Sequence, residues 1–146
     1  MAEKMLVIDD EQVVIDSITK TFIEDNYEVT GTKDPEEGLD LLRNNTYDVI
    51  LCDWNMPGMD GMEVISQIEK HSPESTVLMI SGYPSVDRAT EAMKRGALDF
   101  LPKPFTPEEL KEAVRKAEKK KVQNEKKSFA RFQTRLGSVA FPRPEM

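Results

Sequence analysis

Five short apolar runs alternate with amphipathic stretches along the chain, and this alternation restricts the fold more than any other feature of the sequence. The apolar runs cover residues 5–8, 27–30, 49–52, 76–80 and 99–101. Helical spacing or helix-start signals mark residues 12–25, a segment from residue 34, residues 62–70, residues 86–95 and a segment from residue 106. Strands that alternate with helices predict right-handed crossovers and a parallel sheet covered on both faces. We therefore expect an α/β fold with a five-stranded parallel sheet, doubly wound as a (βα)5 sandwich.

Two helix starts and three strands can be placed more closely. Asp34-Pro35-Glu36-Glu37 and Thr106-Pro107-Glu108-Glu109 each combine a capping side chain, a proline in the first turn and acids at the positive end of the helix. The first, third and fourth runs are apolar throughout, which is typical of central strands covered on both faces. In sheets of this kind the binding site lies at the carboxyl ends of the strands.

Polar side chains follow four of the five predicted strands. They are Asp9, Asp10 and Glu11 after the first strand, Asp53 after the third, Ser81 after the fourth and Lys103 after the fifth. Two carboxylates about 4 Å apart repel by about 4 kcal/mol at an effective dielectric near 20. Converging aspartates therefore need a cation or bound protons, and a hard, oxygen-liganded ion such as Mg²⁺ meets that need.

Acids are common at strand ends, so any one of these residues alone would be an ordinary surface acid. The complete set, with a hydroxyl and an ammonium at two further strand ends, favours phosphoryl transfer to a carboxylate. Mg²⁺ and Lys103 would neutralise the phosphoryl oxygens while Asp53 attacks in line. The acyl phosphate formed in this way is an activated intermediate, suited to a temporary signal.

Four motifs surround these residues. They are Met5-Leu6-Val7-Ile8-Asp9-Asp10-Glu11, Asp53-Trp54-Asn55-Met56-Pro57-Gly58-Met59-Asp60-Gly61, Ser81-Gly82-Tyr83 and Lys103-Pro104-Phe105. Together they resemble the receiver domain of two-component response regulators over about residues 3–121, and the combination is highly specific. The resemblance implies a flavodoxin-like fold and a self-phosphorylating, self-dephosphorylating signalling switch rather than an enzyme. Gly82 departs from the family, which usually has Ala there, and should loosen the loop without removing a donor.

The resemblance also implies a role for each site residue. Asp53 would be the phosphoacceptor. The Mg²⁺ site would consist of the side chains of Asp10 and Asp53, the backbone carbonyl of Asn55, and Asp9 through a metal-bound water. Ser81 and Lys103 would bind the phosphoryl group, and Ser81 and Phe100 would form the switch. The Lys103–Pro104 bond is expected to be cis, because the lysine must turn back into the site while the chain leaves for the last helix.

A sensor histidine kinase or phosphotransferase is the expected partner, docked on the first helix. Val13, Val14 and Ile15 span about 200° of a helix, so not all of them can face the core. With Ile18 and Phe22 on the buried side, Val13 points away from it. The predicted docking residues are Val13, Val14, Ser17, Pro104 and Phe105.

The output surface is expected to be the face formed by the fourth helix, the fifth strand and the fifth helix. Phosphoryl oxygens on Asp53 should draw Ser81 inward, and Phe100 should then rotate from a more exposed rotamer into the vacated space. The same face is a candidate homodimer surface. If Phe100 stays buried throughout, this face is static instead.

Charge divides the chain into two parts. Residues 1–110 contain 23 Asp and Glu against 9 Lys and Arg, whereas residues 111–146 contain 4 against 11. The acidic part argues against nucleic acid as a partner unless a separate effector domain supplies that contact. We expect a receiver domain over residues 1–121 and a basic C-terminal helical extension over residues 122–146, partly helical or disordered. Val122, Phe129, Phe132 and Leu136 recur at helical spacing, with Gly137 as a stop.

Two other classes of protein use similar chemistry or topology. A haloacid-dehalogenase-type Mg²⁺-dependent phosphatase would have its nucleophile in a D-x-D pattern after the first strand, where this chain has Asp9-Asp10-Glu11. A flavodoxin-type binding module needs a first loop that accepts phosphate, which these acids would repel. Within the receiver interpretation, a stand-alone regulator is favoured over the N-terminal part of a transcription regulator with a DNA-binding or ATPase effector.

The compartment is predicted from what the sequence contains and lacks. No apolar stretch approaches the roughly 18 to 20 residues that span a bilayer, and the N-terminus lacks the apolar run of a signal peptide. The one cysteine, Cys52, lies in an apolar run and reads as a core residue in a reducing environment. We therefore expect a cytoplasmic protein without a membrane partner.

Overall fold

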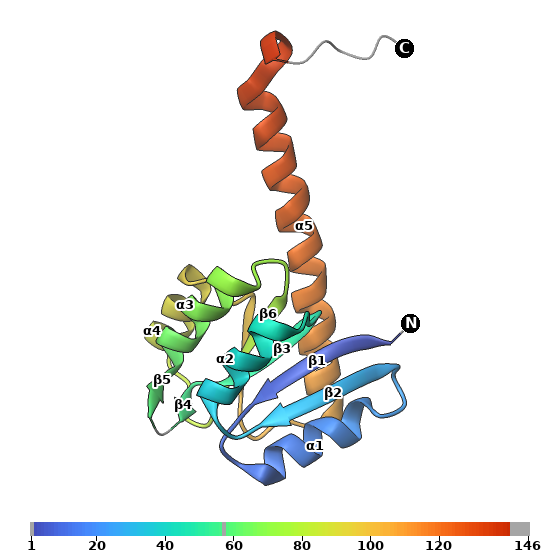
Figure 1. The fold of residues 1–146 in the computed structure, drawn as a ribbon, viewed down its shortest axis with the longest axis vertical. Coiled ribbons are helices and arrows are strands. Elements are labelled where there is room, and N and C mark those ends of the chain that lie inside the picture. Colours follow the sequence, from blue (N-terminus) through green and yellow to red (C-terminus); the bar gives the residue numbers. More distant parts are fainter. Residues whose placement is uncertain (1, 57, 141–146) are drawn as a thin grey trace.

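A computed structural model describes the backbone of residues 2–56 and 58–140 and the side chains of residues 2–56 and 58–125. Its centre is a five-stranded parallel sheet in the order β2-β1-β3-β6-β7 (Figure 1). The strands are β1 (Glu3–Ile8), β2 (Tyr27–Thr32), β3 (Val49–Asp53), β6 (Thr76–Ser81) and β7 (Asp99–Pro102). The predicted doubly wound α/β fold is confirmed.

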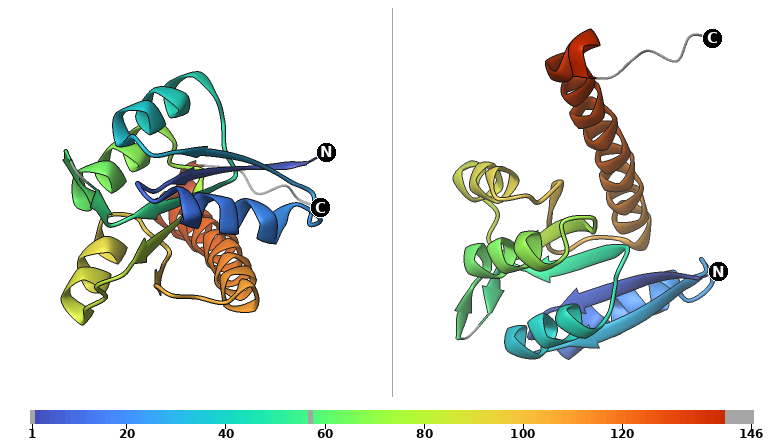
Figure 2. Two further views of the ribbon diagram at one scale, coloured as in Figure 1. Left: turned by 90° about the horizontal axis from the view of Figure 1, so that it is seen from below. Right: turned by 45° about the horizontal axis from the view of Figure 1, so that its top comes forward.

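Five helices cover the two faces of this sheet. They are α1 (Gln12–Phe22), α2 (Pro35–Asn44), α3 (Gly61–His71), α4 (Val86–Lys94) and α5 (Pro107–Ala140). Buried side chains of α1 and α5 pack with alternate residues of β1, β3 and β6 in one core cluster. Those of α2, α3 and α4 pack with the remaining strand residues in a second cluster, so the sheet separates two cores (Figure 2). Among the described helices, none is both long and apolar enough to cross a lipid bilayer.

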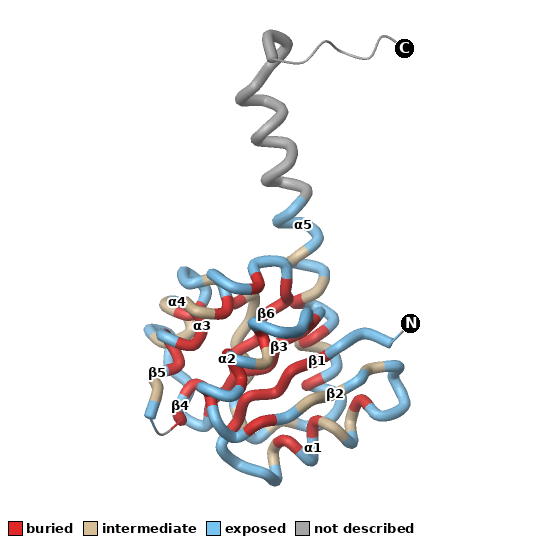
Figure 3. The backbone as a smooth tube through the Cα atoms, viewed as in Figure 1, coloured by how far each residue is buried: buried red, intermediate tan, exposed pale blue. Residues whose placement is uncertain are grey.

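Burial follows the predicted order of the strands. Every residue of β3 and β6 is buried, as is β1 from Met5 onward, whereas the edge strands β2 and β7 are mostly half-buried or exposed (Figure 3). The three strands with uninterrupted apolar runs are therefore the central ones. Their carboxyl ends meet at one edge of the sheet, which is where the polar residues of the sequence motifs lie.

The helix starts follow the predicted capping chemistry. Asp34 Oδ1 accepts a hydrogen bond of 3.0 Å from the Glu36 N–H. At the start of α5, the Glu109 N–H donates to Thr106 Oγ1 at 3.1 Å and the Thr106 N–H donates to Glu109 Oε1 at 2.9 Å. This reciprocal pair satisfies two backbone donors that a helix end leaves unpaired.

Several element ends differ from the sequence-based prediction. The segment expected to be a loop after β3 contains a short antiparallel hairpin of β4 (Asn55–Met56) and β5 (Met59–Asp60). Helix α1 ends at Phe22, three residues early, and the chain reverses at Asn26, whose φ of 61° lies in the left-handed region. The alternation of apolar residues does not encode either feature, because both depend on local turn geometry.

Helix α5 continues far beyond the sheet. Its 34 residues run to Ala140, so the prediction that Gly137 stops the helix is wrong. Figure 1 shows the C-terminal part of α5 leaving the body of the protein. Before it leaves, Lys120 Nζ donates to the Leu98 carbonyl at 3.2 Å and Lys121 Nζ donates to the Pro73 carbonyl. The predicted apolar positions Phe129, Phe132 and Leu136 lie outside the residues whose side chains are described, and residues 141–146 lie outside the described backbone.

Candidate functional site

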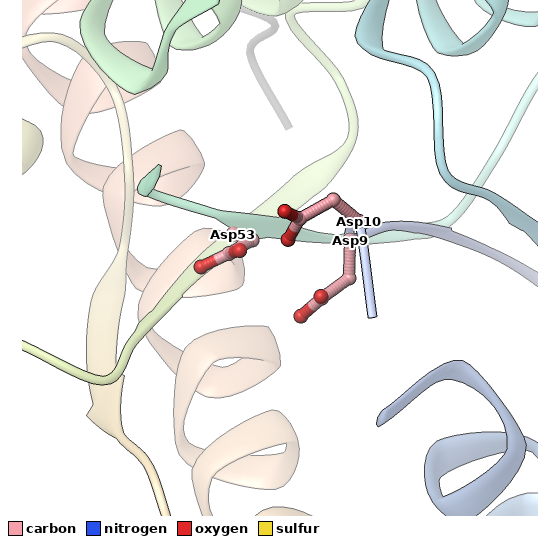
Figure 4. Close-up of side chains that lie close together, drawn as sticks. All are labelled: Asp9, Asp10 and Asp53. Carbon is pink, nitrogen blue, oxygen red and sulfur yellow. The ribbon is translucent and has the colours of Figure 1, made fainter. Parts of the chain in front are cut away.

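Three aspartates gather at the carboxyl edge of the sheet. Asp9 and Asp10 directly follow β1, and Asp53 is the last residue of β3. One carboxylate oxygen from each lies within 4.8 Å of the others (Figure 4). Asp9 and Asp53 are buried, whereas Asp10 is exposed. The sequence-based prediction that these acids meet is confirmed.

Strand register brings the hydroxyl and the lysine to the same edge. Asp53 pairs with Ile80 across the sheet, and the fully buried Ser81 follows Ile80 directly. The Lys103 N–H donates to the Ser81 carbonyl at 2.7 Å, which ties the residue after β7 to the end of β6. The Lys103–Pro104 peptide bond is cis, as predicted.

Lys103 is the cation of this cluster. Its Nζ lies 2.9 Å from Asp9 Oδ2, 3.1 Å from Glu11 Oε1 and 3.6 Å from Asp53 Oδ1. Burial lowers the pKa of Lys103, but its contacts with these carboxylates outweigh burial and raise that pKa overall. Lys103 therefore carries its positive charge at neutral pH.

The buried acids ionise less readily than ordinary ones. Burial, reinforced by the charge of Asp9 and opposed by Lys103, raises the pKa of Asp53 to about 7. Burial also raises the pKa of Asp9, although Lys103 and the Glu11 N–H, which donates to Asp9 Oδ1 at 2.8 Å, favour its charged form. Burial likewise raises the pKa of the neighbouring Cys52 thiol, which makes it an inert core residue.

The donor set fits a divalent cation with oxygen ligands. Asp9 Oδ2 is buried, and its partner among the described residues is Lys103, at 2.9 Å. A single ammonium does not balance three converging carboxylates, so negative charge remains at the edge. Mg²⁺ takes carboxylate and carbonyl oxygens and keeps several waters, and it can bind here beside the exposed Asp10 and Asn55.

A cavity of about 610 Å³ opens beside the acidic cluster. Its lining residues are Glu11, Val13, Val14, Ser17, Gly82, Tyr83, Lys103, Pro104 and Phe105. All five residues predicted to dock a partner are among them. The side chain of Val13 is 73% exposed, which confirms that it points away from the core. Val13 thus adds an exposed apolar side chain to the lining of this cavity, and exposed apolar surface is typical of binding sites.

Phe100, the predicted switch residue, is half-buried and packs against the core. Its ring centroid lies 6.1 Å from that of Trp54 in an edge-to-face arrangement. Its rotation from a more exposed rotamer on phosphorylation compares two states and stays a prediction. Trp54 provides an apolar partner for the ring, and a phenylalanine has no hydroxyl that would favour an outward position.

Sequence reasoning missed two residues of this region. Trp54 is part of a quoted motif but was given no role. It directly follows Asp53, and its ring contacts that of Phe100. Arg88 was not singled out, but its guanidinium lies 5.8 Å from the centroid of the Trp54 ring. Trp54 could have been found from its position directly after Asp53. Arg88 could not, because its reach to the site depends on the conformation of the loop between β6 and α4.

A doubly wound parallel sheet with its polar site at the carboxyl ends of the strands places the chain in the flavodoxin-like class of α/β proteins. Comparison with known proteins identifies the family. The description of that family is response regulator receiver domain, and it matches residues 5–115. The chain belongs to this family, and it is a receiver domain of the two-component type.

Individual relatives agree with this assignment. The response regulator protein FleR of Pseudomonas aeruginosa is 34% identical over 114 residues, which cover 78% of this chain and 24% of FleR. This chain thus spans about a quarter of the length of FleR. The comparisons give no support to the phosphatase alternative.

Solved structures agree in fold. A receiver domain protein from Methanospirillum hungatei has a TM-score of 0.79 at 25% identity, covering 85% of this chain and 99% of that one. A response regulator from Burkholderia pseudomallei, solved with a phosphorylated aspartic acid, a calcium ion and citrate, has a TM-score of 0.74 at 27% identity, covering 85% and 72%.

Proposed function

We propose that this protein accepts a phosphoryl group from a sensor histidine kinase on Asp53 in a Mg²⁺-dependent reaction. The observation that carries the proposal is the position of Asp53, which ends β3 with oxygens of Asp9 and Asp10 within 4.8 Å and Lys103 Nζ at 3.6 Å. The Burkholderia relative, which has a phosphorylated aspartic acid and a calcium ion, supports the same chemistry here.

The residues of the edge divide the work of phosphoryl transfer. An oxygen of the Asp53 carboxylate bonds to phosphorus as the bond from phosphorus to the donor's imidazole nitrogen breaks, and that nitrogen keeps the electron pair. Lys103 supplies positive charge to the transferred group, and the Ser81 hydroxyl can donate a hydrogen bond to it. A bound Mg²⁺ would neutralise further charge on the phosphoryl oxygens, held by Asp10, Asp53, the Asn55 carbonyl and, through water, Asp9.

A small phosphodonor tests this proposal without knowledge of the kinase. Acetyl phosphate with Mg²⁺ should add the mass of one phosphoryl group to the intact protein, and the Asp53→Asn variant should stay unmodified. A chelator should also prevent the modification. A mass shift that persists in Asp53→Asn, or that is unchanged without divalent metal, contradicts the assignment.

Partner and output are part of the same proposal. A helix of the kinase or of a phosphotransferase would dock in the cavity beside Val13, and the apolar part of its lining favours that contact. Phosphorylation of Asp53 would then change the surface formed by α4, β7 and α5, called here the α4–β7–α5 face. That face would control a second copy of the protein or an effector, and nucleic acid would be reached only through an effector domain.

A further inference from the structure

Both backbone polar groups of Tyr83 are engaged in the loop that joins β6 to α4. The Tyr83 N–H donates to Ser81 Oγ at 3.0 Å. The Tyr83 carbonyl accepts from Arg88 Nη1, also at 3.0 Å. Ser81 is fully buried at the end of β6, and a shift of its hydroxyl oxygen breaks this hydrogen bond unless Tyr83 follows it. The position of Ser81 is thus coupled through one residue to Arg88 on α4.

Arg88 has a second contact, on the other side of the site. Its guanidinium lies over the ring of Trp54, 5.8 Å from the centroid. Trp54 directly follows Asp53, is 9% exposed, and donates its N–H to the Ile80 carbonyl at 2.9 Å. The backbone of Trp54 is therefore held beside Asp53, and burial limits the movement of its ring. A planar guanidinium can lie over a ring and donate a directed hydrogen bond at the same time, whereas an ammonium on a flexible stem holds both contacts less rigidly.

We propose that Arg88 is a positioning residue that restrains Ser81 in the unphosphorylated protein. The inference rests on the proposed function of Asp53. For the Ser81 hydroxyl to reach a phosphoryl group on Asp53, the oxygen and the attached Tyr83 must move toward the sheet edge. That movement pulls the Tyr83 carbonyl from Arg88, which the stack on Trp54 holds in place. Arg88 thus opposes the phosphorylated conformation, and its loss favours that conformation.

The restraint has a measurable size. Because only the hydrogen bond from Arg88 to the Tyr83 carbonyl is lost in that movement, and this bond is charge-assisted and exposed, its loss shifts such an equilibrium by about tenfold. Mg²⁺ binding should be spared, because the carboxylates of Asp9, Asp10 and Asp53 make no contact with Arg88 in the described structure. A selective change in affinity for a phosphoryl mimic is therefore the signature of this role.

Beryllofluoride binding to the full chain provides the test, since it mimics a phosphoryl group on an aspartate. Trp54 is the one tryptophan of the sequence, so its emission reports titrations of Mg²⁺ and then of beryllofluoride at saturating Mg²⁺. The variants are Arg88→Gln, Arg88→Lys and, as a control at the C-terminal cap of the same helix, Arg95→Gln. Arg95 contacts Glu91 and Ser66 instead of the loop.

Both Arg88 variants should bind beryllofluoride about tenfold more tightly than the wild type, with Mg²⁺ affinity changed no more than in Arg95→Gln. If Arg88→Lys matches the wild type while Arg88→Gln tightens, an ammonium supplies the restraint as well, and the proposed requirement for a guanidinium is wrong. Unchanged or weaker beryllofluoride binding in both variants also overturns it. A wild-type protein that fails to bind beryllofluoride at all removes the proposed function itself, and this inference with it.

Discussion

The buried side chain of Asp53 is unfavourable to ionise. It lies in the interior beside Asp9, and these two factors raise its pKa to about 7 even though Lys103 is close. An aspartate in the unfolded chain ionises near 3.8. The folded protein therefore holds this proton more tightly than the unfolded chain does, and ionising Asp53 destabilises the fold. A bound cation would offset this unfavourable free energy, because it stabilises the charged form of Asp53.

Replacing Asp53 by Asn should accordingly stabilise the metal-free protein, and only above acidic pH. A raised pKa contributes stability that is fully present below about 3.8 and is lost as the pH rises to about 7. We expect Asp53→Asn to raise the free energy of unfolding by roughly 1–3 kcal/mol at pH 8 and by much less at pH 4. Urea denaturation in the presence of a chelator measures this difference.

The exposed Asp16→Asn variant is the control for that experiment. Asp16 lies on α1 and accepts a hydrogen bond from the Gln12 side chain, away from the acidic cluster. Its substitution controls for the loss of one exposed carboxylate that belongs to no part of the cluster. Saturating Mg²⁺ should shrink the advantage of Asp53→Asn, since the metal binds the native wild-type cluster. An equal gain at both pH values would show that ionisation of Asp53 is not the cause.

At the scale of elements, strand ends were predictable and loop-borne contacts were not. Asp9, Asp53, Ser81 and Lys103 were placed correctly because apolar runs locate parallel strands, and parallel strands send their carboxyl ends to one edge. The contact of Arg88 with Trp54 depends on the exact path of a loop. Turn conformation is set by local hydrogen bonds that hydrophobic periodicity does not contain.

The same reasoning explains the errors at element ends. The β4–β5 hairpin is only two residues long on each side, which is too short for an alternating pattern to be visible. Gly137 was expected to end α5, yet the helix continues to Ala140, because glycine lowers helix stability without forbidding the helix. The contact of Phe100 with Trp54 was not predicted, since Trp54 comes from another strand end.

Helix α1 should carry the contact with the phosphodonor protein. Val13 is 73% exposed and lines the cavity next to Lys103 and Phe105. We expect Val13→Glu to slow phosphotransfer from the cognate kinase at least tenfold, because a carboxylate would be buried in an apolar contact. Labelling by acetyl phosphate should be unaffected, since that donor needs no docking surface. Both rates can be followed by intact mass.

Ile23→Glu is the matched control for the docking variant. Ile23 caps the other end of α1 and is 70% exposed, so the chemical change and the exposure are similar. It lies outside the cavity lining. Ile23→Glu should leave both reactions at the wild-type rate. If Val13→Glu slows both donors equally, the valine affects the chemistry of the site and not the docking of a partner.

At the scale of the whole molecule, α5 runs from the carboxyl ends of the strands to their amino ends. Its first turn follows the Pro104-Phe105 segment beside the phosphorylation site, and Leu110, Val114 and Ala117 bury it against the body. Lys120 and Lys121 then donate hydrogen bonds to the carbonyls of Leu98 and Pro73, which precede β7 and β6 at the amino ends of the strands. The helix leaves the body at that end (Figure 1). The proposed output route therefore runs from Asp53 across the α4–β7–α5 face toward the extension.

That route can be tested by following backbone amides while beryllofluoride is added to the Mg²⁺-bound protein. Phosphoryl oxygens on Asp53 should displace Ser81 and, with it, the loop that leads into α4. Trp54 adjoins Asp53 and contacts Phe100, so Phe100 should respond by repacking from its half-buried position. Because the Phe100 N–H donates to Asp99 Oδ1 and Asp99 pairs with Lys120 at 3.5 Å, the change should continue to Lys120.

We expect amide shifts at the Asp53 pocket, in α4, at Phe100 and at Lys120, and no such series in Asp53→Asn. Shifts confined to the pocket would mean that the α4–β7–α5 face is static and that the extension receives no signal through it.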